Sequence, residues 1–204
     1  GPGIVALTEA YNGTSWTEVA DLNTARSVLG GTGTATAALA VGGSGSTANT
    51  EVWNGSGWTE VNNLNTGKYN NSCAGITTAA ISVGGGPAQS TQVELWNGTS
   101  WTETTEVNSA KNASASSGTS TATISAGGSP AGAVALTEIW NGSAWTEVAD
   151  LNTARFQLNG FGLTTAALVF GGNTNTAATV NTEAWDGSAW AEVGGGVESL
   201  VADN

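Results

Sequence analysis

Short runs of apolar and β-branched residues alternate with Gly, Asn, Asp and Ser along the whole chain. No window of eleven residues keeps a helical spacing of apolar positions free of glycine, β-branched clusters or turn dipeptides, so the pattern predicts strands and no helix. Four strands fit one unit of the pattern, and we name them strands a to d in chain order. In the first complete unit they are Ser27–Gly33, Thr36–Val41, Thr50–Trp53 and Trp58–Val61.

The pattern is an internal repeat. An aromatic residue followed by Asn or Asp, Gly, any two residues and Trp occurs five times, at steps of 42, 43, 44 and 45 residues. A Gly-Gly pair follows four times, and its first Gly always lies 26 residues after the second aromatic of the motif. The change in length therefore falls between Gly-Gly and the next aromatic, which is the loop between strands b and c. The motif begins at Tyr11, Trp53, Trp96, Trp140 and Trp185.

The Asn-Gly dipeptide between strands c and d is a strong hairpin signal. As a two-residue type I′ turn it predicts that Trp53 lies opposite Ser56 and that Glu51 lies opposite Trp58, with Trp53 and Trp58 on one face as a diagonal pair. We interpret the tryptophans as a repeated hydrophobic contact between neighbouring sheets rather than as platforms for a ligand. They are Trp16, Trp53, Trp58, Trp96, Trp101, Trp140, Trp145, Trp185 and Trp190.

A period of 40 to 50 residues with four strands per unit is typical of a β-propeller blade. The chain predicts one all-β domain over 1–204, with a partial blade at 3–22, blades at 26–64, 68–107, 111–151 and 155–193, and a closing tail at 194–204. We expect a five-bladed ring with one incomplete composite blade, in which Val197–Ala202 pairs beside Val5–Ala10 because an open end exposes an unpaired edge. The alternative is a fragment that closes with another copy or with a missing segment.

One unit carries a family resemblance. A basic residue before strand a, an apolar strand b ending in Gly-Gly, and an aromatic followed closely by Trp resemble the kelch repeat, as in Arg26, Ala38–Gly43, Trp53 and Trp58. The Asn-Gly hairpin is tighter than the usual kelch form. The run from the Thr-Glu before Trp140 to Arg155 is similar to kelch-like repeats of bacteriophage and environmental viral proteins. The resemblance implies a propeller but no particular activity, since propellers host many functions.

Composition excludes several functions. The net charge is −12 with only four Lys and Arg, so a nucleic-acid interface is not expected, and no apolar run is long enough to insert in a membrane. The chain has no His and a single Cys73, which we expect to be a buried filler. Copper oxidase and His-dependent hydrolase chemistry is therefore excluded, and we predict no enzyme, no catalytic residue and no cofactor. A sialidase-like propeller hydrolase would need an arginine cluster that two arginines do not supply.

Polar residues also recur once per unit. Carboxylates before the first aromatic and after the second form two rows, a donor type that calcium prefers, yet no Asp-x-Asp-x-Asp-Gly loop occurs and we predict no metal site. We expect one acidic row to pair with the basic row and the other to be solvated. A recurring Asn, at Asn23, Asn65, Asn108 and Asn152, predicts a local staple of the turn between strands d and a. The basic row is Arg26, Lys68, Lys111 and Arg155.

Variable positions indicate where a ligand would bind. The b–c loops differ in length and sequence, and the start of strand a differs in sequence. The sequence favours a non-enzymatic binding and assembly module of a virion or an extracellular surface, contacting a glycan or a protein. The alternative is a purely structural decoration or fibre component without a ligand. The oligomeric state stays open. Candidate ligand-facing residues are Tyr69, Asn71, Gln89, Asn112, Phe156, Asn173 and Asn175.

Overall fold

The computed structural model describes residues 3–87 and 90–193, and these residues form 18 β-strands and no helix. Each complete repeat supplies strands a, b, c and d in order. The strands are β1 Thr8–Tyr11, β2 Trp16–Val19, β3 Gly30–Thr34, β4 Ala37–Val41, β5 Thr50–Trp53, β6 Trp58–Glu60, β7 Ser72–Ile76, β8 Ala79–Val83, β9 Val93–Trp96, β10 Trp101–Glu103, β11 Ala115–Thr119, β12 Ala122–Ala126, β13 Thr137–Trp140, β14 Trp145–Glu147, β15 Asn159–Leu163, β16 Ala166–Phe170, β17 Thr182–Trp185 and β18 Trp190–Glu192.

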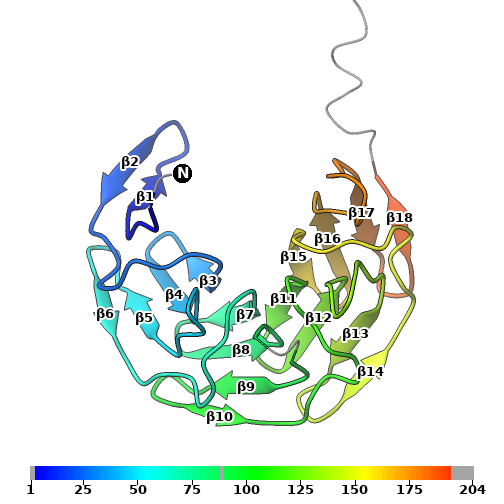
Figure 1. The fold of residues 1–204 in the computed structure, drawn as a ribbon, viewed down its shortest axis with the longest axis horizontal. Coiled ribbons are helices and arrows are strands. Elements are labelled where there is room, and N and C mark those ends of the chain that lie inside the picture. The colour runs from blue at the N-terminus through cyan, green and yellow to red at the C-terminus, as the bar shows by residue number, and fades with distance from the viewer. Residues whose placement is uncertain (1–2, 88–89, 194–204) are drawn as a thin grey trace, which may run out of the picture.

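The strands form four antiparallel sheets of four and one sheet of two. We name the sheets β3–β6, β7–β10, β11–β14 and β15–β18 blades 1 to 4, and the sheet β1–β2 the N-terminal hairpin. In Figure 1 the blades lie side by side along an open arc, with each strand a on the inside and each strand d on the outside. The all-β propeller arrangement predicted from the sequence is confirmed. Of the predicted five-bladed ring, the described residues form four complete blades and one two-stranded remainder.

The arc is open between the N-terminal hairpin and blade 4 (Figure 1). The tail strand Val197–Ala202 that was expected to close the ring lies outside the described residues. Among residues 3–87 and 90–193 there is no helix long and apolar enough to cross a membrane.

The predicted register of the c–d hairpin is wrong. Trp53 lies opposite Trp58, and Glu51 lies opposite Glu60, so the connecting loop has four residues instead of two. The reason is the side chain of Asn54, whose Oδ1 accepts hydrogen bonds from the backbone N–H groups of Ser56 and Gly57 (both 3.0 Å) and closes a wider turn. The two tryptophans do share a face, with ring centroids 5.5 Å apart, but as a directly opposed pair.

The core lies between the blades. Leu39 and Val41 on strand b of blade 1 pack in one cluster with Ala80, Trp96 and Trp101 of blade 2. Equivalent clusters join blade 2 to blade 3 and blade 3 to blade 4. Polar tips of the tryptophans are paired as well: Trp101 Nε1 donates to Thr50 Oγ1 of the preceding blade (3.0 Å). Blades 2 to 4 therefore each bury their tryptophan pair against strand b of the blade before them, which gives three repeated apolar contacts along the arc.

The Gly-Gly pairs let neighbouring blades approach closely. The second Gly of a pair donates its N–H to the carbonyl of the basic residue in the next blade, as from Gly85 to Lys111 (2.8 Å). At Gly84 the backbone is left-handed (φ 63°), and an added Cβ would lie 2.3 Å from Lys111 O. No side chain fits at that distance, so glycine is required there.

We predict that Gly84→Ala destabilises the protein by at least about 1–3 kcal/mol, the cost of a left-handed non-glycine residue before any clash with Lys111 is counted. Gly57→Ala is the matched control, because an added Cβ there has no neighbour within 4 Å. Urea unfolding of the three proteins measures the difference. Equal stability of the two variants would contradict the close approach.

Candidate functional site

The b–c loops and the segments between strands d and a lie at the same end of every blade, which we name the loop face. The residue after each Gly-Gly pair donates its N–H to the carbonyl of the residue that follows the basic one. Gly86 donates to Tyr69 (2.7 Å) and Asn173 donates to Phe156 (2.8 Å) in this way. The variable loops are thus anchored at one fixed backbone contact in each blade.

Four residues with left-handed backbone form the rim of the loop face. They occupy one repeat position, two residues after the basic residue, and none is glycine. In each blade after the first, the rim N–H donates to the rim carbonyl of the preceding blade at 2.7–2.8 Å, so a line of hydrogen bonds runs along the arc. The rim residues are Val28 (φ 51°), Asn70 (53°), Ala113 (54°) and Gln157 (54°).

Sequence reasoning missed this rim. Valine and alanine rarely adopt a positive φ, so residue type gave no signal, and only the constant offset from the basic row marks the position. A strained conformation of this kind costs about 1–3 kcal/mol per residue and persists only where the surroundings fix it. Here the hydrogen bonds to both neighbouring blades fix it.

The rim residues line a shallow, open pocket of about 300 Å³ on the loop face. Its lining mixes uncharged amide and hydroxyl groups with aliphatic side chains. Amides offer both donors and acceptors, so the pocket suits a neutral polar ligand. The lining residues are Val28, Leu29, Asn70, Asn71, Ala113, Ser114, Gln157, Leu158 and Asn159.

Three candidate residues of blades 2 and 3 lie at or near this pocket. Asn71 lines it but is buried, and its Nδ2 donates to Ser82 Oγ inside blade 2 (3.0 Å). Asn112 is half-buried and accepts a hydrogen bond from Asn70 Nδ2 (3.2 Å), which joins two blades. Tyr69 is half-buried and its ring lies over Gly86, where an added Cβ would be 2.5 Å from Cζ.

The candidates in the later loops have other positions. Phe156 and Asn173 are half-buried and pair through their backbones at the base of the blade 4 loop. Asn175 is exposed at the loop tip, and its Oδ1 accepts the N–H of Ala133 from the loop of blade 3 (2.8 Å). Gln89 lies outside the described residues. The structure thus brings Asn71 to the pocket and spreads the others over the surrounding loops.

A buried ion pair supports the loop face in every blade. Each basic residue precedes strand a and contacts the glutamate on strand c of the same blade. Arg26 pairs with Glu51, Lys68 Nζ lies 3.2 Å from Glu94 Oε1, Lys111 Nζ lies 3.8 Å from Glu138 Oε1, and Arg155 Nη2 lies 2.7 Å from Glu183 Oε1. All eight side chains are at most 1% exposed.

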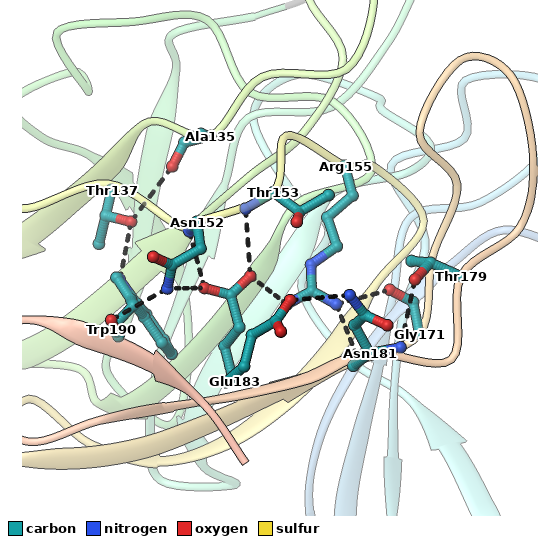
Figure 2. Close-up of polar contacts among 11 residues, drawn as sticks. Ala135, Thr137, Asn152, Thr153, Arg155, Gly171, Thr179, Asn181, Glu183 and Trp190 are labelled. Atoms are coloured by element: carbon teal, nitrogen blue, oxygen red, sulfur yellow. Dashed lines mark hydrogen bonds and ion pairs between the residues drawn. The ribbon is translucent and has the colours of Figure 1, made fainter. Parts of the chain in front are cut away.

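Figure 2 shows the pair in blade 4 with its hydrogen bonds. Glu183 Oε2 accepts from the backbone N–H and the side-chain amide of Asn152 (2.7 and 2.8 Å), while Oε1 accepts from Arg155. Arg155 Nη1 also donates to the carbonyl of Asn181 (2.6 Å), next to strand c. The segment that crosses from the outside of one blade to the inside of the next is therefore held at two points.

The sequence predicted that the recurring Asn stabilises its own turn between strands d and a. This prediction is wrong. In each blade its N–H and its side chain bind the buried glutamate, and its side chain also reaches the carbonyl of a Trp on strand d, as Asn65 does with Trp101 (3.1 Å). Sequence analysis assigned Asn a local partner because Asn commonly caps turns. The sequence did contain one indication of the buried glutamate as the partner, because the Asn and the glutamate each recur once per blade.

Burial and pairing shift the pKa values of this network. Burial raises the pKa of Glu51, but hydrogen bonds from Asn23 and Arg26 outweigh it and hold the pKa below its ordinary value. Burial lowers the pKa of Lys111 to about 8, against the opposing charge of Glu138. Burial raises the pKa of the Cys73 thiol to about 12, so this cysteine stays protonated and is not a nucleophile at neutral pH.

The second acidic row is exposed, at Glu18, Glu60, Glu103, Glu147 and Glu192. In the part of the chain that the structure describes, no three His, Cys, Asp or Glu side chains are grouped to hold a metal ion. Comparison of the sequence with protein-family models and with curated proteins finds no match. The structure shows a propeller-like arrangement of four-stranded blades. Membership of the kelch family stays a prediction.

We predict that Glu94→Ala destabilises the protein by about 3–5 kcal/mol, because it leaves Lys68 buried without its partner charge. Glu103→Ala, in the exposed row of the same blade, is the control and is expected to change stability by less than about 0.5 kcal/mol. Denaturant unfolding followed by tryptophan fluorescence measures both. Similar losses in the two variants would show that the buried pair has no special role.

Proposed function

We propose that this protein is a non-enzymatic binding and assembly module of a virion or another extracellular surface, and that its loop face recognises a glycan. One observation carries the proposal. The backbone of the rim is the same in all four blades, while its side chains differ, being Val28, Asn70, Ala113 and Gln157. A rigid scaffold that displays different side chains at equivalent positions is the usual arrangement of a recognition surface.

The chemistry of the face favours a neutral glycan. Sugar hydroxyls both donate and accept hydrogen bonds, as do the amides of Asn70 and Gln157 that line the pocket. All four cationic side chains of the protein are buried in ion pairs, so no Lys or Arg is exposed to bind sialic acid, sulfate or phosphate. The net charge of −12 adds repulsion against anionic ligands.

The resemblance to kelch-like repeats of bacteriophage and environmental viral proteins supports an extracellular or virion setting. A purely structural role in an assembly is the second candidate. Exposed apolar side chains at the two ends of the arc favour it, since such patches commonly mark contacts between proteins.

We predict that the purified protein binds neutral glycans on an array and not their sialylated or sulfated relatives. Asn70→Ala and Gln157→Ala are expected to weaken this binding at least about tenfold, the effect of one lost hydrogen-bonding group of about 1.4 kcal/mol. Thr102→Ala and Thr146→Ala, at exposed positions of the outer strands, are matched controls.

Isothermal titration with the best array ligand gives the affinities of the four variants. Loss of binding in both control variants, selective binding of anionic glycans, or no binding to any glycan would each contradict the proposal. The last result together with normal incorporation into particles would favour the structural role.

A further inference from the structure

The two ends of the arc expose apolar side chains at positions that are buried in the central blades. On strand b of blade 4, Phe170 is 39% exposed, whereas its counterparts Val41 and Val83 are 0% exposed. On the N-terminal hairpin, Trp16 is 65% exposed, whereas its counterpart Trp101 is 5% exposed. Within residues 3–87 and 90–193, each end of the arc is thus one half of a blade-to-blade contact without its other half.

We name the end on blade 4 the C-terminal face and define it by Phe161, Phe170, Val180 and Val193, which are 39–59% exposed. Phe161 and Phe170 pack together with ring centroids 6.0 Å apart. In blade 1 the position of Phe170 is held by Val41, which packs on blade 2 with Trp96 and Trp101. The C-terminal face therefore points in the direction in which a following blade would lie.

We name the opposite end the N-terminal face and define it by Tyr11, Trp16 and the pocket beside β1. This pocket has a volume of about 310 Å³ and is also lined by Ala38, Trp53 and Trp58 of blade 1. In blade 2 the counterpart of Ala38 is Ala80, which is fully buried under Leu39 and Val41 of the preceding blade. The described residues before β1 form no strand b, so the pocket lies where such aliphatic side chains pack in the complete blades.

We propose that a second copy of this chain docks head to tail, with its C-terminal face against the N-terminal face. This contact would continue one that the chain already makes three times between its own blades. Phe161 and Phe170 are larger than their counterparts Thr32 and Val41. In the part of the chain that the structure describes, the N-terminal hairpin pairs with no strand a or b, and the larger rings of the second copy fill the space that these strands take in a complete blade.

Because the two faces differ, the contact is heterologous, and each added copy again presents one face of each kind. Association is therefore expected to propagate beyond a dimer as the protein concentration rises. Added salt is expected to strengthen it, because salt screens the repulsion between copies of charge −12 and leaves apolar packing intact. This inference does not depend on glycan binding at the loop face.

The test uses sedimentation velocity on the full chain and on two variants, each with one damaged face. Wild-type protein is expected to show species at multiples of 20.2 kDa that grow with concentration. Phe161→Asp leaves only the N-terminal face intact, and Trp16→Asp leaves only the C-terminal face intact. Because the contact needs one intact face of each kind, each variant alone is expected to be monomeric. An equimolar mixture of the two is expected to form a dimer and nothing larger.

Ile76→Asp is the matched control, because Ile76 is 56% exposed but belongs to blade 2 and to neither face, and its variant should associate like wild type. Val193→Asp and Tyr11→Asp repeat the design with other residues, and circular dichroism verifies that each variant is folded. Three results would overturn the proposal. They are a monomeric wild type at every concentration, association that survives in both single variants, and a mixture that remains monomeric.

Discussion

A buried cation held by a buried carboxylate in every blade is the constraint on which this structure depends. The chain has four basic residues, and each is used at one repeat position, opposite a glutamate on strand c. A buried charge without a partner is strongly unfavourable, so the segment that carries Arg26 or Arg155 has only one acceptable place to lie. The same glutamate also accepts two hydrogen bonds from Asn23 or Asn152, which fixes where that segment begins.

The fixed segment determines the geometry of the loop face. Two residues after the buried cation, the chain turns into the left-handed rim, whose hydrogen bonds connect successive blades. The strain of the rim is tolerated because the basic residue before it is fixed at two points. The ion pair holds its side chain, and the glycine pair of the preceding blade donates a hydrogen bond to its carbonyl, as Gly85 does to Lys111. Constant residues thus lie buried beneath a surface where the side chains of Val28, Asn70, Ala113 and Gln157 are free to differ.

Much of this arrangement could be predicted from the sequence because the same pattern of residues occurs in four repeats. The strands, the Gly-Gly pairs and the tryptophan pairs follow from periodicity. The hairpin register did not, because Asn54 closes the turn with its side chain and widens the loop by two residues. The partner of Asn65 could not be predicted from periodicity either, because its distance in sequence to Glu94 depends on the length of the b–c loop.

The candidate site was predictable only in outline. Loop variation predicted recognition at the loop face, which stays a prediction, and it could not show that Asn71 turns inward to Ser82 or that Val28 adopts a positive φ. Both depend on contacts between blades that no single repeat contains. The repeat count indicated an incomplete blade and an open end, but periodicity did not show which side chains that end exposes, because Phe170 and Trp16 occupy positions that are buried in blade 2 as Val83 and Trp101.

A double-mutant cycle at Arg155 and Glu183 measures how much stability the buried ion pair itself contributes. Unfolding free energies are measured for wild type, Arg155→Met, Glu183→Leu and the double variant. We predict that the double variant loses much less stability than the two single variants together, with a coupling energy of about 2–3 kcal/mol, because removing both charges leaves no unpaired buried ion. Losses that simply add would contradict it, since the buried pair would then contribute nothing that its separate members do not.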